Sequence, residues 1–145
     1  MTRLKYAIVI SIVAGLLAPA LPASAQTAPP AALQKMASPV RGIAEMGYLA
    51  PKTKVEGNDV VTTFEVKNLS AGSIVGLQIT EFWYDKANTP VQGTGARQRL
   101  RKPLQPGEVA TIVLRSPKVP AMFRNTYQFV HANGNVKATV LKTLK

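Results

Sequence analysis

The densest group of side chains able to bind a ligand is a short basic segment in the second half of the chain. Arg97, Arg99, Arg101 and Lys102 all lie within residues 97–102. In an extended strand alternate residues project from one face about 7 Å apart, which would place the three arginines side by side. A guanidinium group matches the geometry of carboxylate and phosphate groups. We therefore predict that these four residues bind a partner; the alternative is that they protect an exposed sheet edge from aggregation.

Side chains suited to catalysis are sparse. His131 is the single histidine, and a general base needs a nucleophile and an orienting group within hydrogen-bond reach. No G-x-S-x-G nucleophile motif accompanies it. Glu81 and Asp85 fall on an expected strand and turn, an arrangement that does not produce the facing carboxylates of a glycosidase. We predict no catalytic residue and no enzymatic activity; the alternative is a hydrolase with an unrecognised site.

The composition also argues against bound cofactors. The chain has no cysteine, which excludes disulfides, thiolate zinc sites and iron–sulfur clusters. A single histidine excludes most imidazole metal sites. We predict no cofactor and no metal. The alternative is a periplasmic copper-handling protein, with a soft copper(I) site built from His131 and the methionines Met36, Met46 and Met122.

The charge balance indicates an anionic partner. The chain has 18 Lys and Arg against 7 Asp and Glu, a formal net charge of +11. Such an excess attracts polyanions over long range. Nucleic acid is the usual partner of a cytosolic protein this basic, but the N-terminal sequence described next indicates export. We therefore expect a protein or an anionic envelope component as partner, and no nucleic acid.

The N-terminus resembles a secretory signal peptide. Met1–Lys5 carries two positive charges, Tyr6–Leu17 is almost continuously apolar, and Ala23-Ser24-Ala25 forms an A-x-A cleavage site. This is the order of regions in a signal peptide, and the apolar run is shorter than the roughly 20 residues of a membrane-spanning helix. We predict that residues 1–25 are removed, leaving an exported periplasmic or extracellular protein with no membrane span.

The rest of the chain divides into a linker and one domain. Residues 26–38 are rich in Ala and Pro and lack strand periodicity, as expected of a linker. Residues 39–145 show short β-rich runs separated by turn formers, the pattern of an all-β protein. About seven such runs predict an immunoglobulin-like antiparallel β-sandwich. The runs are Ile43–Leu49, Val60–Lys67, Ile74–Tyr84, Val91–Leu100 (an edge strand or a loose loop), Val109–Arg115, Thr126–Ala132 and Val136–Leu144.

Three local features lead to specific expectations. Trp83, on the long third run, is expected to be the central core aromatic. Glu81 has the same parity as Trp83, so we expect either that it lies at the sheet margin or that a bulge shifts the register near it. Asn133-Gly134 is the sequence favoured in two-residue hairpin turns with positive φ at both positions.

Three segments resemble the FxLYD family, which comprises small immunoglobulin-like domains of exported prokaryotic proteins. They are Phe64–Ser70, a strand followed by Asn and a turn; Glu81–Asp85, in the place of the naming motif; and Leu104–Glu108, a Leu-x-Pro-Gly-Glu turn. Glu81 and Trp83 stand where the motif has Phe and Leu. The resemblance covers about residues 60–141. It implies an immunoglobulin-like fold outside the cytoplasm, and it implies no catalytic residue.

Together these features predict a non-catalytic exported module that binds a partner or supports an envelope assembly. The basic segment is the expected contact with an anionic partner.

Overall fold

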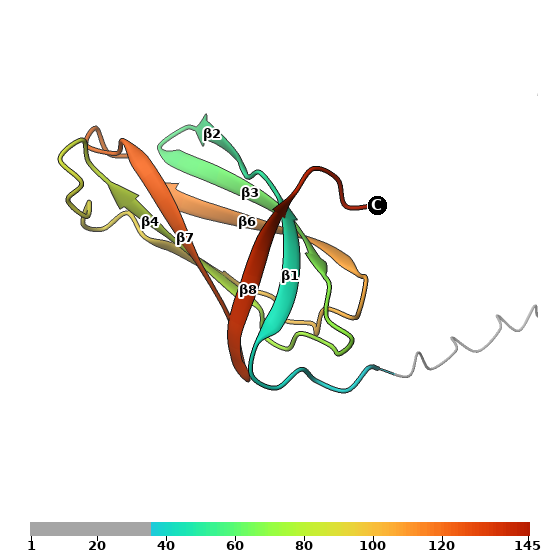
Figure 1. Ribbon diagram of the computed structural model, residues 1–145. Coiled ribbons are helices and arrows are strands. Elements are labelled where there is room, and N and C mark those ends of the chain that lie inside the picture. The colour runs from blue at the N-terminus through green and yellow to red at the C-terminus, as the bar shows by residue number, and fades with distance from the viewer. Residues whose placement is uncertain (1–35) are drawn as a thin grey trace, which may run out of the picture. The chain divides into compact units, whose positions relative to one another are not determined.

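The protein is all-β in the part of the chain that the structure describes, residues 36–145 of a computed structural model (Figure 1). Within these residues there are eight strands and no helix. The predicted signal peptide and most of the predicted linker lie outside the described residues. The strands are β1 Ala44–Leu49, β2 Lys52–Glu56, β3 Asp59–Asn68, β4 Gln78–Tyr84, β5 Ala96–Arg99, β6 Val109–Pro117, β7 Arg124–His131 and β8 Gly134–Leu141.

The strands form one curled, mixed sheet in which neighbours pair in the order β2-β3-β1-β8-β7-β4-β5. The remaining strand, β6, lies off this path and also pairs with β3. β3 pairs with β6 along its length, β4 pairs with β7, and all of these pairs are antiparallel. β1 pairs with β8 in parallel, so the sheet is mixed and not wholly antiparallel as predicted. β7 and β8 pair only next to their turn and then diverge, so β8 continues alongside β1 (Figure 1).

Alternation of side chains explains why β3 and β6 are strands. In β3 the inward face carries Thr62, Phe64 and Val66, all buried, as the period of two predicts. In β6 Ile112 and Leu114 are buried while their neighbours are exposed, again as predicted. The inward face of the two strands is therefore largely apolar, with the buried hydroxyl of Thr62 among its groups.

The centre of the core is Phe64 and not Trp83. Phe64 is fully buried, and its ring meets Tyr127 edge-on at 4.7 Å and Phe129 at 5.9 Å between centroids. Phe129 pairs with Ile79 on β4, and Trp83 lies four residues further along that strand. At about 3.3 Å per residue, four residues place Trp83 about 13 Å along the strand from the core centre. Trp83 is therefore only partly buried, and our expectation of a central core indole is wrong.

The structure adds one strand to those predicted and shortens another. Lys52–Glu56 forms a strand, β2, which the sequence did not reveal because its side chains are mostly exposed and do not alternate. The run predicted as Ile74–Tyr84 begins as a strand only at Gln78, because Ile74 instead forms an isolated bridge with Leu104.

The β7–β8 turn is formed by Ala132 and Asn133, one residue earlier than predicted, since His131 pairs with Gly134. Gly134 has φ of 152°, whereas Asn133 is not in the positive-φ region. The chain at Gly42 passes so close that a side chain on Gly134 would overlap the Gly42 carbonyl. Glycine at 134 thus serves close packing of two backbones, and the predicted turn with two positive φ angles is wrong.

Asn68 joins the turn after β3 to the turn before β6. It is buried, and its Nδ2 donates to the carbonyl oxygens of Gly72 and Leu104, each at 2.8 Å. Its backbone N–H donates to Glu108, and its carbonyl accepts from Gly107. The first and third segments quoted for the FxLYD resemblance therefore contact each other through this residue.

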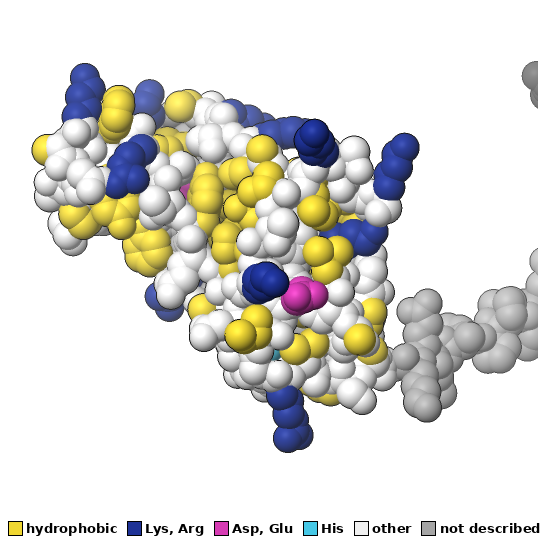
Figure 2. Space-filling model, in the orientation of Figure 1, with side chains coloured by type: hydrophobic (Ala, Val, Ile, Leu, Met, Phe, Trp, Pro, Cys, Tyr) yellow, Lys and Arg dark blue, Asp and Glu magenta, His cyan; other side chains and the backbone are white. Residues whose placement is uncertain are grey.

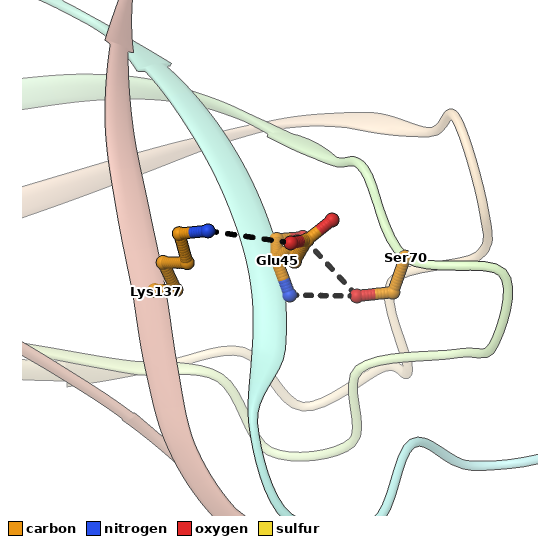
Figure 3. A network of polar contacts seen from close by, with 3 residues as sticks. All are labelled: Glu45, Ser70 and Lys137. Carbon is orange, nitrogen blue, oxygen red and sulfur yellow. Dashed lines mark hydrogen bonds and ion pairs between the residues drawn. The ribbon is translucent and has the colours of Figure 1, made fainter.

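Beside this turn, Ser70 attaches β1 to the chain that follows β3. Its hydroxyl accepts from the Glu45 N–H at 2.8 Å, and on the other side Lys137 of β8 lies 3.7 Å from the Glu45 carboxylate (Figure 3). The segment before β1 is also held: the Ala37 N–H donates to the Gln105 side chain at 3.0 Å.

Candidate functional site

Glu81 is the most enclosed ionisable group in residues 36–145. Its side chain is fully buried, and the β4–β7 ladder is regular from Gln78 to Tyr84. Glu81 therefore lies in the interior with no bulge beside it, which overturns both expectations for this residue. Because it shares the inward face with Ile79, the strand register carries it into the space between β4 and β6.

Three neutral donors from three strands surround the Glu81 carboxylate. Thr62 of β3 and Asn125 of β7 donate to Oε1, each at 2.8 Å, and Ser116 of β6 donates to Oε2 at 2.9 Å. No cation pairs with Glu81 among the described residues. Hydrogen bonds from neutral groups thus offset the cost of burying this carboxylate.

The network continues toward β2. Asn125 also donates to the Tyr127 hydroxyl at 2.7 Å, and the hydroxyls of Thr53 and Thr62 lie 3.3 Å apart. Burial, reinforced by the nearby Glu81 charge, raises the pKa of Tyr127 above its ordinary value of 10.0. The arrangement can orient hydroxyl groups, but its one carboxylate is enclosed and already accepts three hydrogen bonds. This cluster therefore joins strands and offers no surface to a ligand.

His131, the single imidazole, is also engaged within the fold. It is 6% exposed, its Nε2 lies 2.9 Å from the Gly42 carbonyl oxygen, and its Nδ1 lies 3.4 Å from the Asn133 N–H. These contacts are satisfied together when Nε2 carries the proton and Nδ1 accepts. The histidine thereby holds the β7–β8 turn against the chain that enters β1.

The structure does not bring the methionines to His131. Met46 is fully buried in the core, and Met36 lines a groove beside residues 102–108. Met122 precedes β7 whereas His131 ends it, so nearly the full length of that strand separates them. Within residues 36–145 no group of three or more His, Cys, Asp or Glu side chains is placed to hold a metal ion.

Each of the four predicted partner-binding residues is exposed. Arg97 and Arg99 lie on β5, which pairs with β4 alone in the described part of the chain and is therefore an edge strand. β5 ends at Arg99, so Arg101 and Lys102 lie in the bend that follows it. The predicted row of three arginines on one strand is thus shortened to two, with Arg101 beyond the end of the strand.

The strand register defines a larger surface, which we call the outer face of β4, β5 and β7. Directly opposite residues share a face, and the buried residues Ile79 and Glu81 identify the inner one. Arg97 pairs with Thr80 and Arg99 with Gln78, so both arginines point outward. The other members of the outer face are Phe82, Tyr84, Arg124, Thr126, Gln128 and Val130.

The outer face carries no acidic residue. Of the chain's seven acids, Glu81 points inward and Asp85 lies just past β4, where its side chain accepts from the Thr89 N–H at 2.8 Å. The remaining acids belong to other elements: Glu45, Glu56, Asp59 and Glu65 on β1 to β3, and Glu108 before β6. In the view of Figure 2, basic side chains project around the rim while acidic ones are few.

All three ion pairs among residues 36–145 lie away from the outer face. They join Lys54 and Arg115 to Glu56, and Lys137 to Glu45. The hydrogen bond from Lys54, helped by Arg115, holds the pKa of Glu56 below its ordinary value. The arginines of β5 have no such partner among the described residues.

Aromatic groups lie at the far end of the outer face. The Arg124 guanidinium stacks over the Tyr84 ring at 4.8 Å, and the Lys86 ammonium lies 6.0 Å from the Phe123 ring. Phe82 and Phe123 are 40% and 60% exposed. Sequence reasoning missed Arg124 because it is remote in sequence from the basic segment, and only the β4–β7 register places it on the same face.

Comparisons with known proteins supply no family for this chain. No family model matches it, and no curated protein matches it. Among solved structures, one described as the structural characterization of IrmA from Escherichia coli is similar. It shares 12% identity, the match covers 69% of this chain and 93% of that one, and the TM-score is 0.44. None of the described residues forms a helix long and apolar enough to cross a membrane.

Proposed function

We propose that this protein is an exported, non-catalytic, immunoglobulin-like module that binds an anionic envelope partner through the outer face of β4, β5 and β7. The observation that carries the proposal is the separation of charge. Arg97, Arg99 and Arg124 share a face with no acid and form no ion pair within residues 36–145. The signal-like N-terminus supports export.

The immunoglobulin-like assignment is supported by the pairing pattern. β3 with β6 and β4 with β7 form two antiparallel pairs whose inner faces meet at Phe64, Tyr127 and Phe129. Immunoglobulin-like domains also consist of two packed antiparallel layers. The FxLYD resemblance is supported by the contact between its Asn and its Leu-x-Pro-Gly-Glu turn, through Asn68 and Leu104.

Enclosure of the ionisable groups supports a binding role over a catalytic one. Glu81 is fully buried and hydrogen-bonded on both oxygens, and both nitrogens of His131 face backbone groups. A general base must reach the proton of a substrate. Among the candidate site residues, Arg97, Arg99, Arg101 and Lys102 are exposed, and their side chains are suited to binding anions.

The experiment compares two triple variants with the same net charge. Arg97→Gln, Arg99→Gln and Arg124→Gln together remove three exposed charges from the outer face. Arg41→Gln, Lys52→Gln and Lys142→Gln remove three exposed charges elsewhere that take part in no ion pair within residues 36–145. Both variants and the unmodified protein are applied to immobilised dextran sulfate and eluted with salt.

We expect the arginine variant to elute at distinctly lower salt than the control variant, because binding by a localised surface depends on which charges are lost. Circular dichroism spectra matching the unmodified protein show that the fold is kept. Equal elution of the two triple variants would contradict the proposal, since net charge alone would then account for retention.

A further inference from the structure

A shallow groove of about 510 Å³ opens where β5 ends. Its lining comprises Arg99 and Arg101 together with Val75, Gly76, Gln98 and Leu100. The groove lies between the end of the edge strand and the turn that leads into β4. It therefore brings two arginines against a backbone segment distant in sequence.

The backbone at Gly76 supports the Arg99 side chain. A Cβ at Gly76 would collide with the Arg99 guanidinium, so this group lies directly over the glycine. Gly76 also has φ of 61°, a conformation that L-residues with side chains rarely adopt. Glycine thus suits the turn, and its lack of a side chain leaves the space that the Arg99 guanidinium occupies.

The floor of the groove is fixed by hydrogen bonds. The Leu100 N–H donates to the Leu77 carbonyl at 2.8 Å, and the Ala132 N–H donates to the Val75 carbonyl at 2.9 Å. Leu100 packs against the buried core. Because Leu100 is anchored, its two neighbours Arg99 and Arg101 leave the chain from a fixed backbone.

No acid compensates the two arginines. The groove lining contains no Asp or Glu, and neither arginine forms an ion pair within residues 36–145. Edge protection needs only a charge that projects into water. It does not require a guanidinium seated on a glycine, so the geometry at Gly76 favours a binding role.

We propose that this groove is a phosphate-binding site in which Arg99 and Arg101 donate to one phosphate group. The inference rests on the proposed function and names the anion that the basic segment takes. A carboxylate has two oxygens and is matched by a single guanidinium fork, whereas a phosphate has three terminal oxygens and up to two charges. Two arginines bordering one groove therefore fit phosphate better. The phosphate is either free or part of a lipid headgroup.

The test uses charge-conserving variants of the ¹⁵N-labelled protein. Arg99→Lys keeps the charge and removes the planar fork. Arg41→Lys makes the same change at an exposed arginine outside both the groove and the outer face. Gly76→Ala leaves both arginines in place but obstructs the seat of Arg99. The probes are inorganic phosphate, malonate as a dicarboxylate of similar charge, and phosphatidic acid vesicles compared with phosphatidylcholine vesicles.

We expect phosphate to shift the Gly76 amide and the Arg99 side-chain signals. We expect Arg99→Lys and Gly76→Ala to weaken binding by about fivefold or more, and Arg41→Lys by less than about twofold. If binding of inorganic phosphate is weakened by Arg99→Lys, the groove is a site for free phosphate. If only binding to phosphatidic acid vesicles is weakened by Arg99→Lys, the groove is a site for a lipid headgroup. Both results support the proposal.

Equal weakening by Arg99→Lys and Arg41→Lys, malonate binding as tight as phosphate, or no binding of either phosphate probe would overturn the phosphate site. Suppose that the phosphate site fails but the arginine triple variant still elutes at lower salt than the control variant. The proposed function would then stand without the phosphate site. If the two triple variants eluted together, the broader proposal would fail as well.

Discussion

Ser116 Oγ donates a hydrogen bond to Glu81 Oε2 over 2.9 Å and so joins β6 to β4 through the interior of the protein. Thr62 and Asn125 add bonds from β3 and β7 to the other carboxylate oxygen. One buried side chain therefore connects four strands that are distant in sequence. This makes Glu81 a structural residue whose removal affects all four strands.

Replacing Glu81 tests this assignment. Glu81→Ala removes the acceptor of three hydrogen bonds, two of them from the buried hydroxyls of Thr62 and Ser116. We expect it to lower the free energy of unfolding by about 3–5 kcal/mol. Glu81→Gln keeps one oxygen acceptor, and the hydroxyls of Thr62 and Ser116 can rotate to accept from the new amide. We expect it to cost about 2 kcal/mol or less. Urea denaturation measures both, and an alanine variant as stable as the glutamine variant would contradict the network.

The raised pKa of Tyr127 predicts a change of stability at alkaline pH. Below the unfolded-state value of about 10 both states carry the phenolic proton, so the hydroxyl's contribution is fully present. As pH rises above that value the unfolded chain ionises first, and the contribution is lost as pH approaches the higher folded-state pKa. Denaturation midpoints of the protein and of Tyr127→Phe should therefore converge above pH about 10. Parallel profiles would contradict the raised pKa.

The position of the core centre predicts an order of sensitivity among aromatic residues. Phe64→Ala removes a fully buried ring that packs on Tyr127 and Phe129, and should cost about 3–5 kcal/mol. Trp83→Phe removes an indole whose Nε1 is buried without a hydrogen-bond partner in residues 36–145, and should cost less than about 1 kcal/mol. Thermal unfolding of the two variants decides the order, and a larger loss from Trp83→Phe would show that the core is centred elsewhere.

Asn68 provides a test of the contact between the two turns. Asn68→Ala removes the Nδ2 donor to Gly72 and Leu104 and should destabilise the protein by about 2 kcal/mol or more. Asn68→Asp has nearly the same shape but places acceptor atoms opposite two carbonyl oxygens, so it should be at least as damaging. Denaturant titration measures both losses. Stability retained in Asn68→Asp would mean that the amide donor is not what holds the turns.

The sequence predicted the all-β class and the inward faces of β3 and β6 because alternation in those strands is nearly complete. It did not predict β2, whose exposed residues carry no such period. Trp83 was misplaced because parity identifies the face of a strand but not the distance along it from the core centre. Glu81 was misplaced because its donors Thr62, Ser116 and Asn125 come together only in the folded chain.

The same distinction applies to the candidate site. Arg97, Arg99, Arg101 and Lys102 are adjacent in sequence, so their clustering could be predicted, and the structure confirms that they are exposed. The groove at Gly76 could not be predicted, because it depends on a turn some 20 residues upstream lying against the end of β5. That depends on tertiary packing, which a single sequence does not display.

The most direct measurement of the central claim is a nuclear magnetic resonance titration of the labelled protein with soluble dextran sulfate at low salt. The account predicts that the largest amide shifts lie along the outer face of β4, β5 and β7, at residues such as Thr80, Arg97 and Arg99, and that they disappear as salt is raised. Shifts concentrated on β1, β2 and β6, or spread evenly over all exposed lysines and arginines, would contradict it.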